Sequence, residues 1–229
     1  MAMTGERTTQ PLGTLVQPGF ARLTVVGGAA PAGLSFGVSS DSMTVGLAGC
    51  EIDLTGDARV SARHATIAYE DGRLVVRDEG SVNGVWHAIR EPADLAVGAI
   101  FRLGDQVYRV DAMNDDRDYT WQDGTKLLTS PRRTGTFRVI QLLEGGRAGY
   151  SASAVDDVVT IGGQGSRLAM LGEPHISARH ATVTRHGDVF RLEDHGSVNG
   201  TYVRVDGVQV LADGDLLWVG GTLFRVDIV

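Results

Sequence analysis

The chain of 229 residues is 42% hydrophobic and 21% charged, which is typical of a globular protein of one or two domains. A net charge of −7 without a basic cluster argues against nucleic acid, whose binding depends on neutralising phosphates with Lys and Arg. Cys50 is the only cysteine, so an intrachain disulfide is excluded and nothing calls for an oxidising compartment.

Residues 1–17 open the chain without the basic-then-apolar layout of a signal peptide. No apolar run in the sequence approaches the roughly 18 residues that are needed to span a bilayer. We therefore expect a flexible N-terminal tail on a cytoplasmic protein that does not bind a membrane.

The first half of the chain contains short β-rich runs that are separated by glycine turns. ARLTVV at 21–26 is the first of these runs, and AIFRL at 99–103 is one of the last. TIAYEDGRLVVRDEG at 66–80 holds two runs around Asp71-Gly72, a dipeptide that favours a tight hairpin because both turn positions prefer a positive φ. No stretch of a dozen residues has the apolar spacing of an amphipathic helix.

Residues 113–134 are polar, carry Pro131 and lack a clear periodicity, so we interpret them as a linker. The strand pattern then resumes with TFRVIQLL at 136–143. In TVTRHGDVFRLED at 182–194, His186-Gly187 takes the place of the earlier turn. Many short strands with glycine turns predict an all-β protein, either a sandwich or a barrel.

The two halves are copies of each other at an offset of 116 residues, without an insertion. SARHAT occurs at 61–66 and again at 177–182, and GSVNG occurs at 80–84 and again at 196–200. The match covers about 90 residues, which is the size of one small domain. The predicted organisation is therefore a tail at 1–17, domains at 18–112 and 135–229, and a linker at 113–134.

The serine and histidine of SARHAT stand three residues apart, a pairing that can mean a nucleophile and its base. Ser61 or Ser177 would then need an orienting carboxylate, for which Asp78 or Asp194 is available. However, SARH leads into a strand pattern, in which residues three apart do not converge, and no Gly-x-Ser-x-Gly turn surrounds either serine. Six histidines and one cysteine show no metal-ligand spacing, so we predict no enzyme, no cofactor and no metal site.

The residues alone leave two interpretations of these loops open. In the first, His64 and His180 hydrogen-bond to the backbone at the start of a strand, and the Asn-Gly pairs are tight turns. In the second, Ser, Arg and Asn side chains from neighbouring loops form one polar patch at an end of the sandwich, where recognition sites usually lie.

A glycine after a strand, then V/I-S-x-x-H-A, then a D-x-x-S-x-N-G turn together resemble the forkhead-associated (FHA) domain, and both copies carry this combination. The resemblance implies a two-sheet β-sandwich of about eleven strands per copy, whose loops bind phosphothreonine peptides. It implies a phosphate contact for Ser61 and Ser177, and a contact to the peptide backbone for Asn83 and Asn199. Supporting roles within the loops are implied for His64, His180, Gly46, Gly84, Gly162 and Gly200.

Three side chains that contact phosphate in the family are replaced in both copies. The family's arginine follows the first glycine, where this chain has Leu47 and Gly163. A charge-assisted contact of this kind contributes about 1.5–3 kcal/mol, roughly ten- to a hundred-fold in affinity. Arg167 lies in the corresponding loop of the second copy and, because Gly163 leaves room, is the candidate to replace that arginine. The other replacements are Ala62 and Ala178 after the loop serine, and Val82 and Val198 before the turn asparagine.

We therefore expect a non-catalytic protein-interaction adaptor whose binding has reduced or no dependence on phosphate. The alternative is phosphothreonine-peptide recognition in kinase signalling, mainly through the second copy. The expected partner is a protein or a phosphothreonine peptide, with a Ser/Thr kinase or its substrate as one candidate. A further hypothesis is that a phosphorylated threonine docks on a domain of this chain or of another copy, with four candidates: Thr8, Thr9, Thr129 and Thr134.

Overall fold

The computed structural model describes residues 21–38, 42–113, 120–128 and 135–228. These residues form 20 β-strands and one short 3-10 helix, η1 (Glu144–Gly146), so the predicted all-β class is confirmed. In this part of the chain, no helix is long and apolar enough to cross a membrane. The predicted tail at 1–17 and the four candidate threonines lie outside the described residues.

Each repeat supplies ten of the described strands, close to the eleven that the resemblance implies. Those of the first repeat are β1 (Ala21–Gly28), β2 (Ser35–Val38), β3 (Ser42–Gly46), β4 (Ile52–Asp53), β5 (Arg63–Glu70), β6 (Arg73–Asp78), β7 (Val85–Ala88), β8 (Ala93–Leu95), β9 (Ile100–Leu103) and β10 (Gln106–Ala112). Those of the second are β11 (Phe137–Leu142), β12 (Ala148–Ser153), β13 (Val158–Gly162), β14 (Leu168–Ala169), β15 (Arg179–His186), β16 (Val189–Asp194), β17 (Thr201–Arg204), β18 (Val208–Val210), β19 (Leu216–Val219) and β20 (Thr222–Ile228).

The hairpins β5–β6 and β15–β16 follow the predicted pattern with one difference. Asp71 and Gly72 form the first turn with positive φ angles of 49° and 75°, as predicted. In the second hairpin His186 pairs with Val189, so the turn residues are Gly187 and Asp188, one position later than predicted. Gly187 takes a φ of 64° at the first turn position, which costs glycine nothing and would strain histidine.

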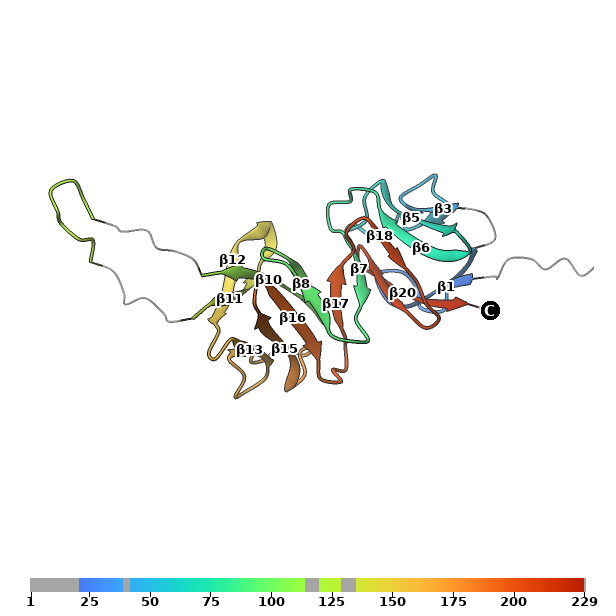
Figure 1. Ribbon diagram of the computed structural model, residues 1–229. Coiled ribbons are helices and arrows are strands. Elements are labelled where there is room, and N and C mark those ends of the chain that lie inside the picture. Colours follow the sequence, from blue (N-terminus) through green and yellow to red (C-terminus); the bar gives the residue numbers. More distant parts are fainter. Residues whose placement is uncertain (1–20, 39–41, 114–119, 129–134, 229) are drawn as a thin grey trace, which may run out of the picture.

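The strands form three sheets that pack as two sandwiches side by side (Figure 1). A ten-stranded sheet runs through both sandwiches in the order β12-β11-β10-β9-β17-β7-β19-β20-β1-β2. The sheet β18-β6-β5-β3-β4 packs on the half that ends in β2, and together they make the first sandwich. The sheet β14-β13-β15-β16-β8 packs on the other half and makes the second sandwich.

Each sandwich is built from both repeats, because the C-terminal strands of the repeats change places. β8 of the first repeat pairs with β16 of the second, with Leu95 opposite Phe190. β18 of the second repeat pairs with β6 of the first, with Gln209 opposite Val76. β9 and β10 then complete the second sandwich beside β11, and β19 and β20 complete the first beside β1. We call residues 93–112 and 208–228 the exchanged segments.

The sequence predicts one sandwich in each contiguous stretch, 18–112 and 135–229, whereas in the structure the C-terminal strands of the two repeats are exchanged. Its physical basis is that the two repeats have matching strand patterns, so each strand meets an equivalent neighbour in either sandwich. Phe224 of the second repeat thus lies in one core with Leu23 of the first, and Phe101 lies in the other core with Phe137. The same apolar positions are buried in either arrangement, so hydrophobic periodicity does not distinguish the two.

The two repeats meet where β7 and β17 pair at the centre of the ten-stranded sheet (Figure 1). The pairing is antiparallel and sets His87 opposite Val203, which occupy the same position in their repeats. A pseudo-twofold axis therefore passes between these residues. On the neighbouring strands β9 and β19, the guanidinium carbon of Arg102 lies 4.0 Å from the centre of the Trp218 ring, a cation–π contact that joins the repeats.

Candidate functional site

In each repeat, a glycine at the end of one strand lies very close to the loop before another strand. Gly46 of β3 meets the loop before β5, and Gly162 of β13 meets the loop before β15. A Cβ built on Gly46 would lie 2.3 Å from the carbonyl oxygen of Ala62, and one on Gly162 would lie 2.4 Å from that of Ala178. Only a residue without a side chain allows this approach. The next backbone amide donates to the same carbonyl, at 3.1 Å in the first repeat and 2.9 Å in the second.

The histidine of each SARHAT is fully buried and joins two loops through their backbone atoms. Nδ1 of His64 accepts a hydrogen bond from the backbone N–H of Ser61 at 3.0 Å, and Nε2 donates to the carbonyl oxygen of Gly84 at 3.1 Å. His180 makes the same two contacts in the second repeat, both at 3.1 Å. One accepting and one donating nitrogen describe a neutral ring. Each histidine therefore ties the serine loop to the Asn-Gly turn.

The serine hydroxyls accept hydrogen bonds from the turns and do not face the histidine rings. Oγ of Ser61 accepts from the backbone N–H of Val82, and Oγ of Ser177 accepts from that of Val198, both at 3.1 Å. Because both ring nitrogens bond to the backbone, the nucleophile-and-base arrangement is not formed. Burial lowers the pKa of His180 below its ordinary value of 6.5, which favours the neutral ring that these contacts require.

The carboxylates of Asp78 and Asp194 hold the turns that follow β6 and β16. Asp78 accepts from the backbone amide of Ser81 at 2.7 Å. Asp194 accepts from the hydroxyls of Ser197 at 2.6 Å and Thr201 at 2.5 Å. Burial alone would raise the pKa of Asp194, but these hydrogen bonds outweigh it and the pKa lies below its usual range. Asp78 thus holds its turn through backbone amides, and Asp194 through backbone amides and two hydroxyls.

The turn asparagines reach toward the loop that precedes each serine. Nδ2 of Asn83 donates to the carbonyl oxygen of Arg59 at 2.8 Å, and Nδ2 of Asn199 donates to that of His175 at 3.1 Å. Val82 and its counterpart in the second repeat precede these asparagines and are 85% and 87% exposed. Each repeat therefore brings a serine, an asparagine and an exposed apolar side chain together where its loops meet.

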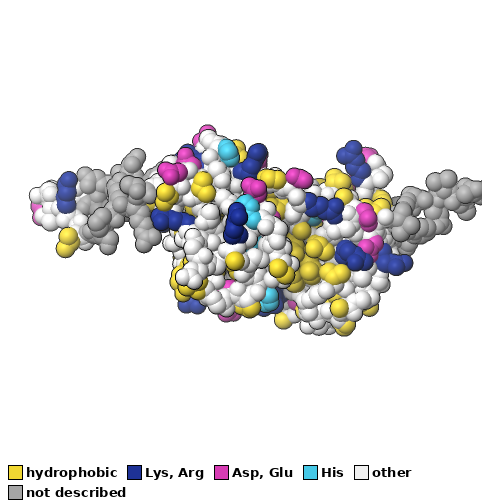
Figure 2. All heavy atoms as spheres, turned by 90° about the horizontal axis from the view of Figure 1, so that it is seen from below, with side chains coloured by type: hydrophobic (Ala, Val, Ile, Leu, Met, Phe, Trp, Pro, Cys, Tyr) yellow, Lys and Arg dark blue, Asp and Glu magenta, His cyan; other side chains and the backbone are white. Residues whose placement is uncertain are grey.

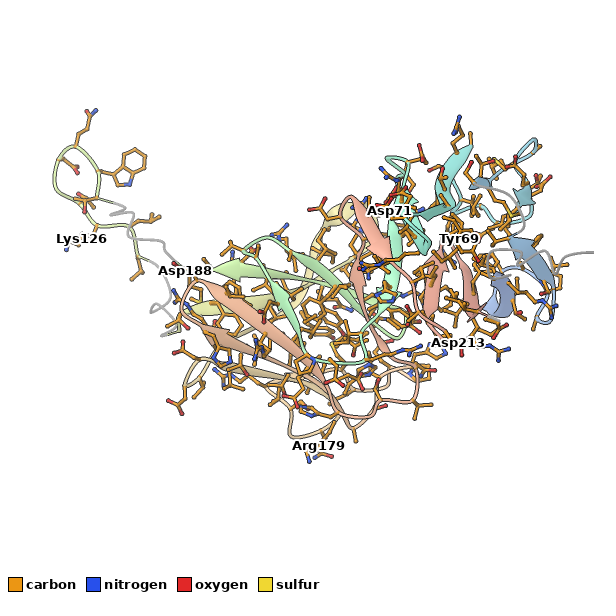
Figure 3. All side chains as sticks on the ribbon, turned by 45° about the vertical axis from the view of Figure 1, so that its right-hand side comes forward. Tyr69, Asp71, Lys126, Arg179, Asp188 and Asp213 are labelled. Atoms are coloured by element: carbon orange, nitrogen blue, oxygen red, sulfur yellow. The ribbon has the colours of Figure 1, made fainter. Side chains whose placement is uncertain are left out.

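Arg167, the fifth predicted site residue, is not brought to this cluster. Its Nε donates to the carbonyl oxygen of Ser153 on β12 at 3.0 Å, and its backbone amide donates to Oγ1 of Thr160 at 2.8 Å. The guanidinium is therefore engaged on a neighbouring strand and makes no bond to Ser177. Arg179, which begins β15, projects outward at one end of the β15–β16 hairpin, and Asp188 lies at the other end (Figure 3).

An arginine that no sequence motif marks lies in the serine loop of the first repeat. Arg59 precedes Ser61 by two residues, and its guanidinium has no hydrogen-bond or ion-pair partner among the described residues. The equivalent residue of the second repeat is His175, whose Nδ1 lies 3.0 Å from Oδ2 of Asp105. Positions 59 and 175 are equivalent in the two repeats. The carboxylate beside His175 is that of Asp105, which belongs to the exchanged segment of the first repeat.

The sequence motifs and the sandwich fold agree with a known family of protein-interaction modules. The sequence pattern of the FHA domain matches residues 40–104 and 159–220, which together are more than half of the chain. The chain therefore belongs to the FHA domain family and carries one matching region in each repeat. A search of curated proteins finds no match.

Parts of the chain are similar to solved structures. Mycobacterium tuberculosis EmbR in complex with a low affinity phosphopeptide is 20% identical over 48% of this chain and 27% of its own length, with a TM-score of 0.25. A protein from an analysis of phosphothreonine-dependent FHA domain interactions is 30% identical over 37% of this chain and 86% of its own, with a TM-score of 0.22. The FHA domain of CT664 from Chlamydia trachomatis is 24% identical over 37% of this chain and 90% of its own length, with a TM-score of 0.22.

Proposed function

We propose that this chain is a non-catalytic adaptor that binds partner proteins through the loops of both repeats, with little or no dependence on phosphate. The observation that carries the proposal is the lack of a cation where the family places its phosphate arginine. Leu47 stands there in the first repeat and packs against the hydrophobic core, and Gly163 in the second has no side chain. The partner would present an extended peptide segment to these loops.

The loop serines retain one donor each for a ligand. Oγ of Ser61 already accepts from the backbone of the Asn-Gly turn, so its own proton is available to donate, and the same holds for Ser177. A neutral hydroxyl suits a carbonyl or hydroxyl oxygen of a partner. It does not balance a phosphate that carries a charge of about −1.5 to −2, which is why phosphate is not expected to dominate binding.

The exposed valines beside the asparagines support recognition of an apolar side chain. Val82 and Val198 stand where the family has a threonine that reaches the phosphate, and both are almost fully exposed. Burying one such side chain against a partner contributes about 1.5 kcal/mol or more. On the face seen in Figure 2, acidic and basic side chains are interspersed.

A second candidate function, phosphothreonine recognition, is favoured by one observation at the first site. Arg59 is an exposed cation in the same loop as Ser61 and has no partner among the described residues. The second site has less support for this role, because Arg167 is engaged by Ser153 and His175 faces Asp105. If phosphate is recognised at all, we therefore expect it at the first site.

The test is binding of the full chain to a degenerate peptide library in which every peptide is offered with threonine and with phosphothreonine. The proposal expects affinities for the two forms within about threefold, and weaker binding of both forms by about tenfold when Ser61→Ala and Ser177→Ala are combined. A preference of more than about tenfold for the phosphorylated form would contradict it.

Arg59→Ala and His175→Ala are a matched pair that separates the two candidate functions. A phosphate preference that disappears in Arg59→Ala and persists in His175→Ala would establish phosphothreonine recognition at the first site. Equal behaviour of the two variants toward both peptide forms would support the phosphate-independent adaptor.

A further inference from the structure

The turn between β9 and β10 belongs to the first repeat but packs against the serine loop of the second. A Cβ built on Gly104, which has a φ of 54°, would lie 2.5 Å from the carbonyl oxygen of His175. This is the carbonyl that accepts the side-chain hydrogen bond of Asn199. The backbone N–H of Gly104 also donates at 3.1 Å to the carbonyl oxygen of Gly200, which the ring of His180 contacts too. The turn of one repeat thus touches two atoms that fix the site of the other.

The turn between β19 and β20 makes the reciprocal contact with the serine loop of the first repeat. A Cβ built on Gly220, which has a φ of 59°, would lie 2.5 Å from Cγ2 of Val60 and 3.0 Å from the carbonyl oxygen of Arg59. That carbonyl accepts the hydrogen bond of Asn83. The two contacts are therefore related by the same pseudo-twofold symmetry as the repeats.

Polar side chains fasten each exchanged turn to the loop that it touches. Asp57 is 4% exposed, and its Oδ2 accepts from the backbone N–H of Gly221 at 2.8 Å and from the hydroxyl of Thr222 at 2.9 Å. In the other sandwich, Gln106 donates to the carboxylate of Glu173 at 3.1 Å, next to the contact of His175 with Asp105. A buried carboxylate with two donors from the other repeat is costly to separate from them, so the loop and the turn form one unit.

We propose that each candidate ligand loop is positioned by the exchanged turn of the other repeat, so that both repeats build each site. The inference concerns the construction of the sites proposed above, but its test needs no ligand. Gly104 and Gly220 are positioning residues in this scheme, since they contact the loop and not the ligand. A change in the exchanged turn of one repeat should therefore loosen the site of the other and leave its own intact.

Amide hydrogen exchange of the full chain tests the proposal with Gly104→Ala. The reporters are the amides of Ser177 and Val198, which the site itself hydrogen-bonds, and the equivalent amides of the first repeat, Ser61 and Val82. We expect exchange about tenfold faster at Ser177 and Val198, with the first repeat unchanged. Faster exchange at Ser61 and Val82 instead, or at neither pair, would overturn the proposal.

The chain offers a matched control on each exchanged segment. Gly98 also has a positive φ, 82°, but a Cβ built there meets nothing within 4 Å, so Gly98→Ala adds backbone strain without the contact. Gly220→Ala should loosen Ser61 and Val82, with Gly214→Ala as its control, because a Cβ there meets only the end of the Arg90 side chain at 3.1 Å. Control variants that loosen the reporters as much as Gly104→Ala and Gly220→Ala would also overturn the proposal.

A second measurement on the otherwise unchanged chain covers the case in which these variants do not fold. In the linker, the backbone N–H of Trp121 donates to the carbonyl oxygen of Thr125 at 2.8 Å and closes a turn at 121–125. A protease site placed in this turn allows the linker to be cut after folding. Because the segments on either side of the cut are interleaved in both sandwiches, the cut chain should elute as one particle of about 24 kDa. Separation into two folded particles of half that mass would mean contiguous domains and would overturn the proposal.

Discussion

The two candidate sites share one backbone frame and differ in the side chains around it. In both, a buried histidine joins the serine loop to the Asn-Gly turn through bonds of 3.0 or 3.1 Å. Around that frame, Arg59 of the first site has no partner among the described residues, whereas its equivalent His175 faces Asp105. Likewise Glu51 binds the backbone amide of Thr44 at 2.8 Å, where the second site has Arg167.

This difference separates the residues that the fold requires, which are the same in both sites, from the surrounding side chains that a ligand would contact, which differ. A buried backbone amide or carbonyl without a partner costs about 1–3 kcal/mol, so each residue of the frame is fixed by the atoms that it satisfies. We call the positions that differ between the sites, 59 and 175 and 51 and 167, the rim. A side chain at the rim has water as an alternative partner, so its identity can change without loss of the fold. The sites should therefore respond alike to changes in the frame and differently to changes at the rim.

The largest expected effect is equal in the two sites and comes from His64→Ala or His180→Ala. Each substitution removes a fully buried ring and leaves a backbone N–H and a carbonyl without their partner. We expect the free energy of unfolding to fall by about 3 kcal/mol in either variant, measured by urea denaturation.

His186→Ala is the control, because His186 is an exposed residue at the end of β15 and its loss should cost less than about 0.5 kcal/mol. A cost below about 1 kcal/mol in one of the two buried histidines would show that the shared frame is not equally important in both sites.

A smaller effect should follow from restoring the family's arginine, and here the sites should differ. Gly163→Arg introduces the side chain at a position where a Cβ would lie 3.3 Å from Cα of Ala178, so only a small shift is needed. Leu47→Arg must also remove a half-buried apolar side chain that packs against the core of the first sandwich. We expect Gly163→Arg to tighten binding of phosphothreonine peptides roughly ten- to a hundred-fold, and Leu47→Arg to gain less.

Titration calorimetry with paired threonine and phosphothreonine peptides measures this gain. Gly163→Gln is the matched control, since it adds a side chain of similar reach without the charge. Equal gains for arginine and glutamine, or for the two peptide forms, would mean that the missing charge does not set the phosphate dependence.

The frame was predictable from the sequence, while the rim and the connectivity were not. The residues of the frame recur in both repeats at a fixed offset: the glycine before the loop, Ser61 and His64 at their spacing, and the Asn-Gly turn. Each is required by local backbone contacts, so a sequence motif is sufficient to predict it. The direction of Arg167 depends on Ser153, 14 residues earlier in the chain, whose carbonyl offers an acceptor that no motif marks.

The strand exchange could not be predicted for a different reason. β18 and β8 are equivalent strands, so β6 or β16 gains a partner of the same kind from either repeat. What differs is only which copy supplies the exchanged turn, and hence that Asp105 faces His175. Such a choice depends on the connections between β7 and β8 and between β17 and β18, and not on the apolar pattern of any strand.

The smallest expected effect is a loss of stability in mild acid through His180. Its pKa in the folded protein is lowered by burial from the ordinary value of 6.5, which applies to the unfolded chain. The unfolded state therefore binds the proton more readily than the folded state. The contribution of the neutral ring to the free energy of unfolding is complete above pH 6.5 and is lost as the pH falls below that value. One titrating group changes the free energy of unfolding by at most about 1.4 kcal/mol per pH unit.

Urea denaturation between pH 7.5 and pH 5.0 measures this slope in the wild type and in His180→Gln, which is less stable overall but has no ring to protonate. The carboxylates with lowered pKa values titrate below this range, so they do not mask the effect. The slope should be smaller in the variant. An equal slope in both proteins would mean that protonation of His180 does not couple to folding, and that its ring can leave the frame without unfolding the sandwich.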